Sequence, residues 1–130
     1  MCEKNLLQKA TEVIDKIKSA GHTLALAESC TGGWLSKIIT DVSGVSAVYK
    51  GGICSYSNEV KMKLLGVEEE TLIRYGAVSQ QTARQMALGV KAAMGSDIGV
   101  GITGIAGPDS DNTKKPVGLI YVALAFGDDV

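Results

Sequence analysis

The six residues Thr23–Glu28, TLALAE, form a short and nearly continuous apolar run, and the turn residues SCTGG and a helical pattern follow at once. Such a run is typical of a strand that is buried on both faces of a largely parallel sheet. Two glycines, Gly32 and Gly33, stand where the next helix begins. These features favour a layered α/β fold.

The rest of the chain continues this alternation. We expect helices over 3–19, 33–40, 59–66, 68–75 and 80–95, and strands over 23–28, 47–56, 97–103 and 117–126. The connection 104–116 has no helical pattern, so the last strand is expected to return antiparallel. The predicted fold is a single-domain three-layer α/β/α sandwich with a mixed, mostly parallel sheet over residues 1–130. The expected core face of helix 80–95 is Ala83, Met86, Ala87, Val90 and Ala93.

Charge and composition restrict the partners. A chain of 130 residues with 45% hydrophobic content can bury a real core as one domain. Its 13 basic and 14 acidic residues are interspersed, which indicates neither nucleic-acid nor membrane binding and favours a small soluble substrate. The first 21 residues hold no apolar stretch long enough for a signal peptide or a membrane span. We therefore expect a cytoplasmic protein.

The cysteines and the histidine restrict the cofactors. Cys2, Cys30 and Cys54 form no CxxC pair, which suits a reducing compartment better than a disulfide scaffold. With a single histidine, the chain has almost no candidate ligands for zinc. We expect no metal and no other cofactor.

Three polar clusters, 28–31, 55–58 and 103–104, come at the carboxyl ends of predicted strands, where open α/β sheets bind ligands. In one interpretation Ser29 is a nucleophile exposed by the tight turn, and the amides of Cys30–Gly33 form an oxyanion hole. In the other, Ser29 or Thr31 only caps the next helix and the glycines only allow the turn. The sequence leaves both interpretations open.

A serine nucleophile needs a base. His22 lies at the opposite end of the same strand, so a Ser-His-Asp arrangement is not expected. Lys61 falls in the first turn of a helix capped by Ser57 or Asn58, where the helix dipole disfavours the ammonium form. The alternative is a solvated helix lysine. Lys63 faces elsewhere.

Three further features each allow two interpretations. Tyr56 could relay a proton or stack on a ring, or it could be a packing tyrosine. Cys30 could be a rival nucleophile or a small buried filler. The loop after Thr103 could present amides to an anion or merely connect two strands. The segment 99–104, GVGITG, matches a dinucleotide motif in letters only, because no helix follows it.

Four segments in this order resemble the CinA C-terminal domain family, the stand-alone nicotinamide-nucleotide amidases. They are 27–67, beginning AESCTGGW, then 76–87, GAVSQQTARQMA, then 101–110, GITGIAGPDS, and 115–123, KPVGLIYVA. The resemblance covers nearly the whole chain. It implies an amidohydrolase that converts nicotinamide mononucleotide to nicotinate mononucleotide and ammonia without a metal.

The resemblance also implies roles for single residues. Ser29 would be the nucleophile, Lys61 its base, and Tyr56 and Thr103 supporting hydroxyls in the same pocket. The substrate would be bound by Cys30, Thr31, Gly32, Gly33, Gly104 and Gly107. The protein would form a homodimer. Family members typically continue past the position of Val130 with a strand and a helix, which we expect to be lacking here. That difference keeps open a second hypothesis, a non-catalytic nucleotide-binding or interaction module.

Overall fold

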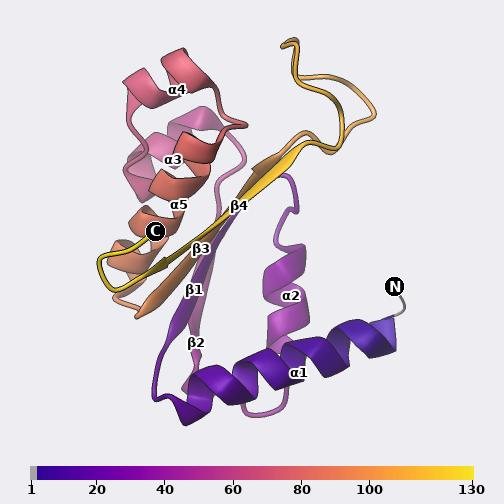
Figure 1. Cartoon of the computed structure of the whole chain (residues 1–130), viewed down its shortest axis with the longest axis vertical. Coiled ribbons are helices and arrows are strands. Elements are labelled where there is room, and N and C mark those ends of the chain that lie inside the picture. Colours follow the sequence, from indigo (N-terminus) through magenta and orange to yellow (C-terminus); the bar gives the residue numbers. More distant parts are fainter. Residues whose placement is uncertain (1–2) are drawn as a thin grey trace.

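In the computed structural model, which describes residues 3–130, the predicted helices and strands follow one another in the expected order (Figure 1). Cys2 lies outside the described residues. The elements are α1 (Glu3–Ser19), β1 (Leu24–Glu28), α2 (Trp34–Thr40), a 3₁₀ turn η1 (Val45–Ala47), β2 (Tyr49–Cys54), α3 (Asn58–Leu65), α4 (Glu69–Tyr75), α5 (Gln80–Met94), β3 (Ile98–Gly104) and β4 (Ile120–Phe126).

The four strands form one sheet in the order β2-β1-β3-β4. β1 runs parallel to both β2 and β3, so that Glu28 pairs with Cys54 on one side and with Ile102 on the other. β4 pairs antiparallel with β3. The mixed, mostly parallel sheet and the antiparallel return are therefore confirmed. The carboxyl ends of β1, β2 and β3 meet at one edge.

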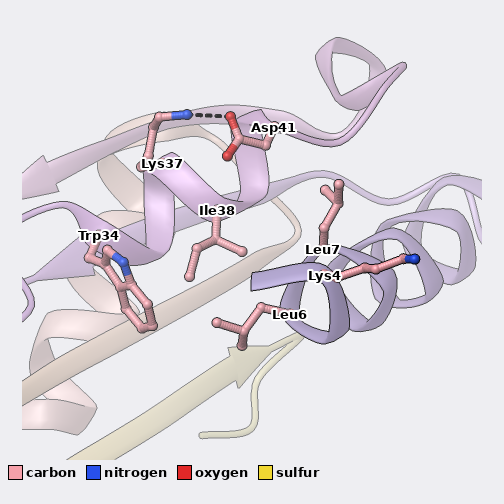
Figure 2. Close-up of a pocket in the computed structure, with 7 residues that line it drawn as sticks. All are labelled: Lys4, Leu6, Leu7, Trp34, Lys37, Ile38 and Asp41. Carbon is pink, nitrogen blue, oxygen red and sulfur yellow. Dashed lines mark hydrogen bonds and ion pairs between the residues drawn. The ribbon is translucent and has the colours of Figure 1, made fainter. Parts of the chain in front are cut away.

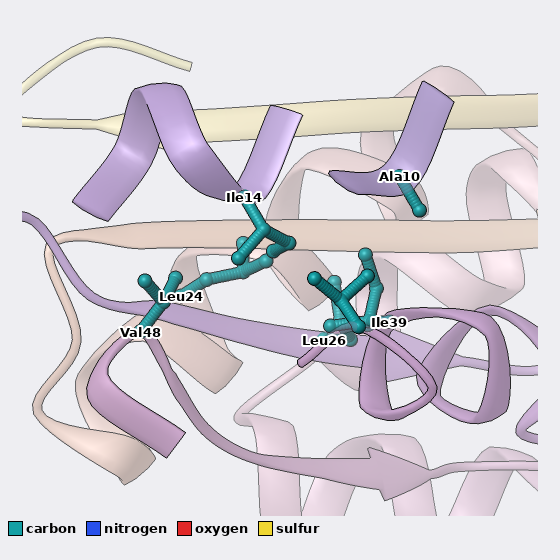
Figure 3. Packing of buried hydrophobic residues seen from close by; sticks show 7 residues of the cluster. Ala10, Ile14, Leu24, Leu26, Ile39 and Val48 are labelled. Atoms are coloured by element: carbon teal, nitrogen blue, oxygen red, sulfur yellow. The ribbon is translucent and has the colours of Figure 1, made fainter. Parts of the chain in front are cut away.

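Helices cover the sheet on two sides, α1 and α2 on one and α3, α4 and α5 on the other (Figure 1). Successive side chains of a strand point to opposite faces, and the two cores follow this rule. The core on the α1 side contains Ala10, Ile14, Leu24, Leu26, Ile39, Val42 and Val48 (Figure 3). The core on the α5 side contains Ala25, Ala27, Leu65, Val67, Met86 and Val90. The side chains of Glu28 and Ser29, the next two residues, consequently point to opposite faces of the sheet.

The glycines of GVGITG allow α5 to approach β3 closely. A Cβ atom at Gly101 would lie 2.5 Å from the Ala83 carbonyl oxygen, and one at Gly99 would lie 2.2 Å from the Ala87 carbonyl oxygen. Only glycine fits where a helix backbone comes this near to a strand. These glycines thus serve helix–sheet packing and lie within β3, as the sequence indicated.

Three expectations about the elements were wrong in detail. β2 starts at Tyr49 because residues 45–47 form the 3₁₀ turn η1, and it ends at Cys54 rather than at residue 56. β4 starts at Ile120 rather than Val117. Ala93 is exposed, whereas Met94, four residues after Val90, packs on the α5-side core. Four residues bring a helical side chain back to the same face more closely than three do, which explains the exchange.

One face of β4 remains uncovered. Ile120, Val122, Leu124 and Phe126 alternate along the strand, and all four are exposed. They pair with the β3 residues that face α1 and α2, so they extend that face of the sheet beyond the two helices. The expectation that a last strand and helix are lacking stays a prediction.

Candidate active site

Ser29 lies at the end of β1, in a turn that leads into α2. The Gly32 amide donates to the Ser29 carbonyl over 3.1 Å, and the Trp34 amide donates to the Thr31 carbonyl over 3.0 Å. Gly32 and Gly33 have φ angles of 61° and 97°, a left-handed conformation that favours glycine. The turn therefore needs its glycines, and it directs the Ser29 side chain to the α3 side of the sheet.

Lys61 of α3 points its amine at Ser29. The helix begins after Ser57, whose hydroxyl accepts from the Val60 amide, so Ser57 rather than Asn58 is the cap. The Lys61 side chain is only 1% exposed, and its Nζ donates to Ser29 Oγ over 3.2 Å. The alternative of a solvated helix lysine was wrong. Lys63 is exposed, as expected.

Two main-chain carbonyls complete the surroundings of the Lys61 amine. Nζ donates to the Ser55 carbonyl over 2.8 Å and to the Tyr56 carbonyl over 3.2 Å. Within residues 3–130, no carboxylate forms an ion pair with this amine. Burial disfavours the ammonium form and lowers the pKa of Lys61.

This arrangement has a direct chemical consequence. A carbonyl oxygen can only accept, so in the neutral amine the two N–H groups are taken by the carbonyls of Ser55 and Tyr56. The lone pair then faces the Ser29 hydroxyl. Lys61 in this position can accept the proton of Ser29.

The carboxylate of Glu28 holds the start of α2 on the opposite face of the sheet. Oε1 accepts from the Thr31 hydroxyl over 2.7 Å and the Leu35 amide over 2.8 Å, and Oε2 accepts from the Ser36 amide over 2.9 Å and the Ser36 hydroxyl over 2.7 Å. Burial alone would raise the pKa of Glu28, but these hydrogen bonds outweigh it and hold the pKa below its usual value.

Sequence reasoning placed Glu28 in a polar cluster without giving it a role. Neither Ser29 nor Thr31 caps α2: the cap position is Gly33, which has no side chain, and Glu28 accepts from the helix amides instead. The interpretation of Ser29 or Thr31 as a helix cap was therefore wrong. A glycine at the cap position was the signal that another residue had to supply the acceptor.

The loop also contains Cys30 and the candidate oxyanion amides. Burial raises the pKa of the half-buried Cys30 thiol, which disfavours the thiolate that a cysteine nucleophile requires. The Gly32 amide already donates to the Ser29 carbonyl. The amides of Cys30 and Thr31 donate to no backbone carbonyl in the described part of the chain.

Tyr56 and Thr103 lie at the carboxyl ends of the neighbouring strands. Tyr56 is 79% exposed, so it is not the packing tyrosine of the alternative interpretation. The Thr103 hydroxyl is buried and donates to the Ala77 carbonyl over 2.8 Å, in the connection between α4 and α5. In this structure neither hydroxyl donates to Ser29 or Lys61.

A depression of about 340 Å³ lies at the carboxyl ends of β2 and β3. Tyr56 and residues 104–111 line it, among them Gly104 and Gly107. A Cβ atom at Gly104 would lie 3.0 Å from Cys30 Sγ, so the depression borders the loop of Ser29 through Gly104. Cys30, Thr31, Gly32 and Gly33 belong to the turn and do not line the depression themselves.

Other polar or hollow regions lie away from Ser29. His22 pairs with Asp97, 3.7 Å away, at the opposite end of the sheet, so no Ser-His-Asp arrangement forms. A hollow of about 450 Å³ lies between α1 and α2, on the face of the sheet opposite Lys61 (Figure 2). Lys37 and Asp41, which form an ion pair, belong to its lining. Within residues 3–130, histidine, cysteine and carboxylate side chains form no cluster suited to a metal ion. In the same range, no helix is both long and apolar enough to cross a membrane.

The fold and the site together define an α/β protein with a buried serine–lysine pair at the carboxyl ends of its parallel strands. The sequence profile described as the CinA C-terminal domain matches residues 6–130, and the chain belongs to this family.

Several named proteins are similar in sequence to the chain. The nicotinamide-nucleotide amidohydrolase PncC of Escherichia coli K12 is 46% identical over 125 residues, which are 96% of this chain and 76% of the relative. The CinA-like protein of Desulfovibrio desulfuricans is 52% identical over 118 residues, which are 91% of this chain and 28% of the relative. The chain spans about a quarter of the length of the latter protein and of the putative competence-damage inducible protein of Acetivibrio thermocellus.

A solved structure supports the same relationship. The competence/damage inducible protein CihA of Agrobacterium tumefaciens superposes with a TM-score of 0.91 at 39% identity. The match covers 96% of this chain and 76% of that one. Both the sequence and the fold thus place the chain in the family.

Proposed function

We propose that the protein is an amidohydrolase that deamidates nicotinamide mononucleotide to nicotinate mononucleotide and ammonia. The single observation that carries this proposal is the contact between Lys61 Nζ and Ser29 Oγ, made by an amine whose pKa is lowered by burial. The name of the Escherichia coli relative, a nicotinamide-nucleotide amidohydrolase, supports the choice of substrate.

The proposed reaction has two halves. Lys61 takes the proton of Ser29 while Oγ attacks the carboxamide carbon, and the carbonyl oxygen becomes an oxyanion. In this proposal the amides of Cys30 and Thr31 hold that oxyanion. Lys61 then gives its proton to the leaving nitrogen, ammonia departs, and an ester joins Ser29 to the nicotinate group. In the second half, Lys61 takes a proton from the water that attacks this ester and gives it to Ser29 Oγ as the ester bond breaks and nicotinate mononucleotide leaves.

The other site residues take supporting roles in this proposal. Tyr56, Gly104 and Gly107 line the depression in which we expect the substrate to bind. Thr103 fixes the end of β3 through its bond to Ala77. Thr31, Gly32 and Gly33 hold the turn that carries Ser29. No metal or cofactor takes part.

The test is release of ammonia and nicotinate mononucleotide from nicotinamide mononucleotide, with a chelator present. We expect turnover by the parent protein and a loss of at least about 1,000-fold in Ser29→Ala. Ser46→Ala, at an exposed serine of η1, is the matched control and keeps full activity. Full turnover by a folded Ser29→Ala protein contradicts the proposal, as does tight binding of the nucleotide by the parent without any ammonia release.

We further propose that the protein acts in the cytoplasm as a homodimer. The free thiols of Cys30 and Cys54 support a reducing compartment. The uncovered apolar face of β4 supports association, because exposed patches of this kind usually mark contact surfaces. Analytical ultracentrifugation at micromolar protein concentration distinguishes a dimer from a monomer.

A further inference from the structure

Residues 104–111 form most of the lining of the depression, and they belong to the loop 104–116, which extends beyond the ends of the strands (Figure 1). Main-chain hydrogen bonds between Ile105 and residues 118–119 close the base of this loop. Past that base, in the part of the chain that the structure describes, residues 106–114 form hydrogen bonds only within the loop. The shape of the depression therefore depends on what else holds the loop in place.

Lys115, in the returning limb of the loop, joins it to the connection between α4 and α5. Its Nζ donates to the Tyr75 carbonyl over 2.7 Å and to the Val78 carbonyl over 2.5 Å. Hydrogen bonds from an ammonium group are stronger than those between neutral groups. Among residues 3–130, no carboxylate forms an ion pair with this ammonium, so nothing there competes with the two carbonyls. Lys115 thus fixes the returning limb to another element of the fold.

The connection between α4 and α5 is a firm anchor, because side chains also bond to the two carbonyls between those that Lys115 contacts. The Gly76 carbonyl accepts from the buried Thr82 hydroxyl over 2.7 Å, and the Ala77 carbonyl accepts from the buried Thr103 hydroxyl over 2.8 Å. Thr103 immediately precedes the loop, and Lys115 lies near its end. Both limbs of the loop are therefore bound to the same connection.

We propose that Lys115 is a positioning residue, whose ammonium fixes the loop 104–116 against the connection between α4 and α5 and so sets the shape of the depression in which the substrate binds. This inference rests on the proposed function for the identity of the substrate, and it adds a residue outside the serine–lysine pair on which binding depends. Lys115 does not line the depression and acts through the loop residues that do. Its removal leaves the contact between Lys61 and Ser29 in place, because β1 and α3 carry that contact.

The first measurement is amide hydrogen exchange, resolved by residue with NMR, in the protein without ligand. In Lys115→Met we expect the amides of Gly118 and Leu119, at the base of the loop, to exchange at least about tenfold faster than in the parent. Lys115→Arg keeps exchange within about twofold of the parent, because a guanidinium can donate to both carbonyls. Lys114→Met is the matched control: it removes the same charge from an exposed neighbour that forms no ion pair within residues 3–130, and it leaves exchange unchanged.

The second measurement is the affinity for nicotinamide mononucleotide, by isothermal titration in the Ser29→Ala background. Lys115→Met weakens binding about tenfold, Lys115→Arg restores most of it, and Lys114→Met changes nothing. With Ser29 present, Lys115→Met raises KM about tenfold and lowers kcat less than about threefold, since the reactive pair is intact. Thermal unfolding of each variant verifies that the fold is intact, and a general loss of stability would not divide KM from kcat in this way.

The outcomes separate this inference from the proposed function. Unchanged exchange at Gly118 and Leu119 in a folded Lys115→Met protein overturns the positioning role, and so does faster exchange with unchanged affinity. Weaker binding without faster exchange also overturns it, because Lys115 would then contact the nucleotide directly. If the Ser29→Ala protein with Lys115 intact binds no nicotinamide mononucleotide, the proposed function fails, and the exchange measurement alone decides whether Lys115 fixes the loop.

Discussion

At the scale of single residues, Lys61 has opposite effects on stability and on chemistry. Its amine is buried without an ion-pair partner among the described residues, so folding disfavours the charged form. The folded-state pKa of Lys61 lies below the unfolded value of about 10.4. Folding is therefore penalised most below the folded-state pKa, and the penalty disappears as the pH rises past the unfolded value.

Lys61→Met is expected to abolish ammonia release and to stabilise the fold at neutral pH. Methionine fills similar space without a charge, and a single stabilising substitution commonly adds about 0.5–2 kcal/mol of stability. Urea unfolding at pH 7 and at pH 10.5 measures the effect, and the gain should shrink at the higher pH. Lys63→Met, at an exposed position of the same helix, is the control and should change neither property. A destabilised Lys61→Met protein at pH 7 would contradict the argument.

Glu28→Gln is expected to destabilise the protein by about 1–3 kcal/mol. Four donors bond to the two carboxylate oxygens of Glu28, and glutamine replaces one of these oxygens with an NH₂ group, which cannot accept from them. The folded-state pKa of Glu28 is lowered, so the parent holds this stability above the unfolded pKa and loses it as the pH falls through the folded value. The gap between parent and variant in urea unfolding should thus narrow in acid. Glu59→Gln, at an exposed position, gives the baseline, and a gap independent of pH would refute the assignment.

At the scale of elements, the close packing of α5 on β3 depends on Gly99 and Gly101, which have no side chain. Gly101→Ala places a methyl group against the Ala83 carbonyl, and α5 must then move away from β3. We expect a loss of about 1–3 kcal/mol, which is typical of overpacking. Chemical denaturation measures it, with Ala93→Ser on the exposed side of α5 as the control. An unchanged unfolding midpoint for Gly101→Ala would show that α5 and β3 can accommodate a methyl group here, and would contradict the prediction.

The same elements show what the sequence could and could not predict. α1, β1 and α5 followed from periodicity and turn residues, since each carries its own pattern. The start of β2 and the exposure of Ala93 did not, because they depend on how neighbouring elements pack. In the site, the approach of Lys61 to Ser29 was a hypothesis from helix geometry. The hydrogen bonds from the Leu35 and Ser36 amides to Glu28 could not be predicted, because they depend on where the start of α2 lies relative to β1.

At the scale of the whole molecule, the topology brings distant segments together. Because β1, β2 and β3 are parallel, Ser29, Ser55 and Thr103 all lie at one edge of the sheet. The Ser55 amide donates to the Glu28 carbonyl over 2.7 Å, and the Ser55 carbonyl accepts from Lys61. The order of the strands, rather than any one motif, therefore sets the distance between Ser29 and Lys61.

The two faces of this sheet also separate the reactive pair from the uncovered apolar face of β4, which includes Val122 and Leu124. Val122 is 65% exposed, and its neighbours along that face are exposed as well, so together they form a continuous patch. Val122→Thr with Leu124→Thr should weaken the proposed dimer in analytical ultracentrifugation and leave ammonia release unchanged, because Ser29 and Lys61 contact each other on the other face. Ile73→Thr removes an exposed apolar side chain on α4 and should leave the association state as it is. If the double variant loses turnover while its unfolding midpoint is unchanged, then the two faces are coupled, and the separation of patch and site inferred from the strand register is wrong.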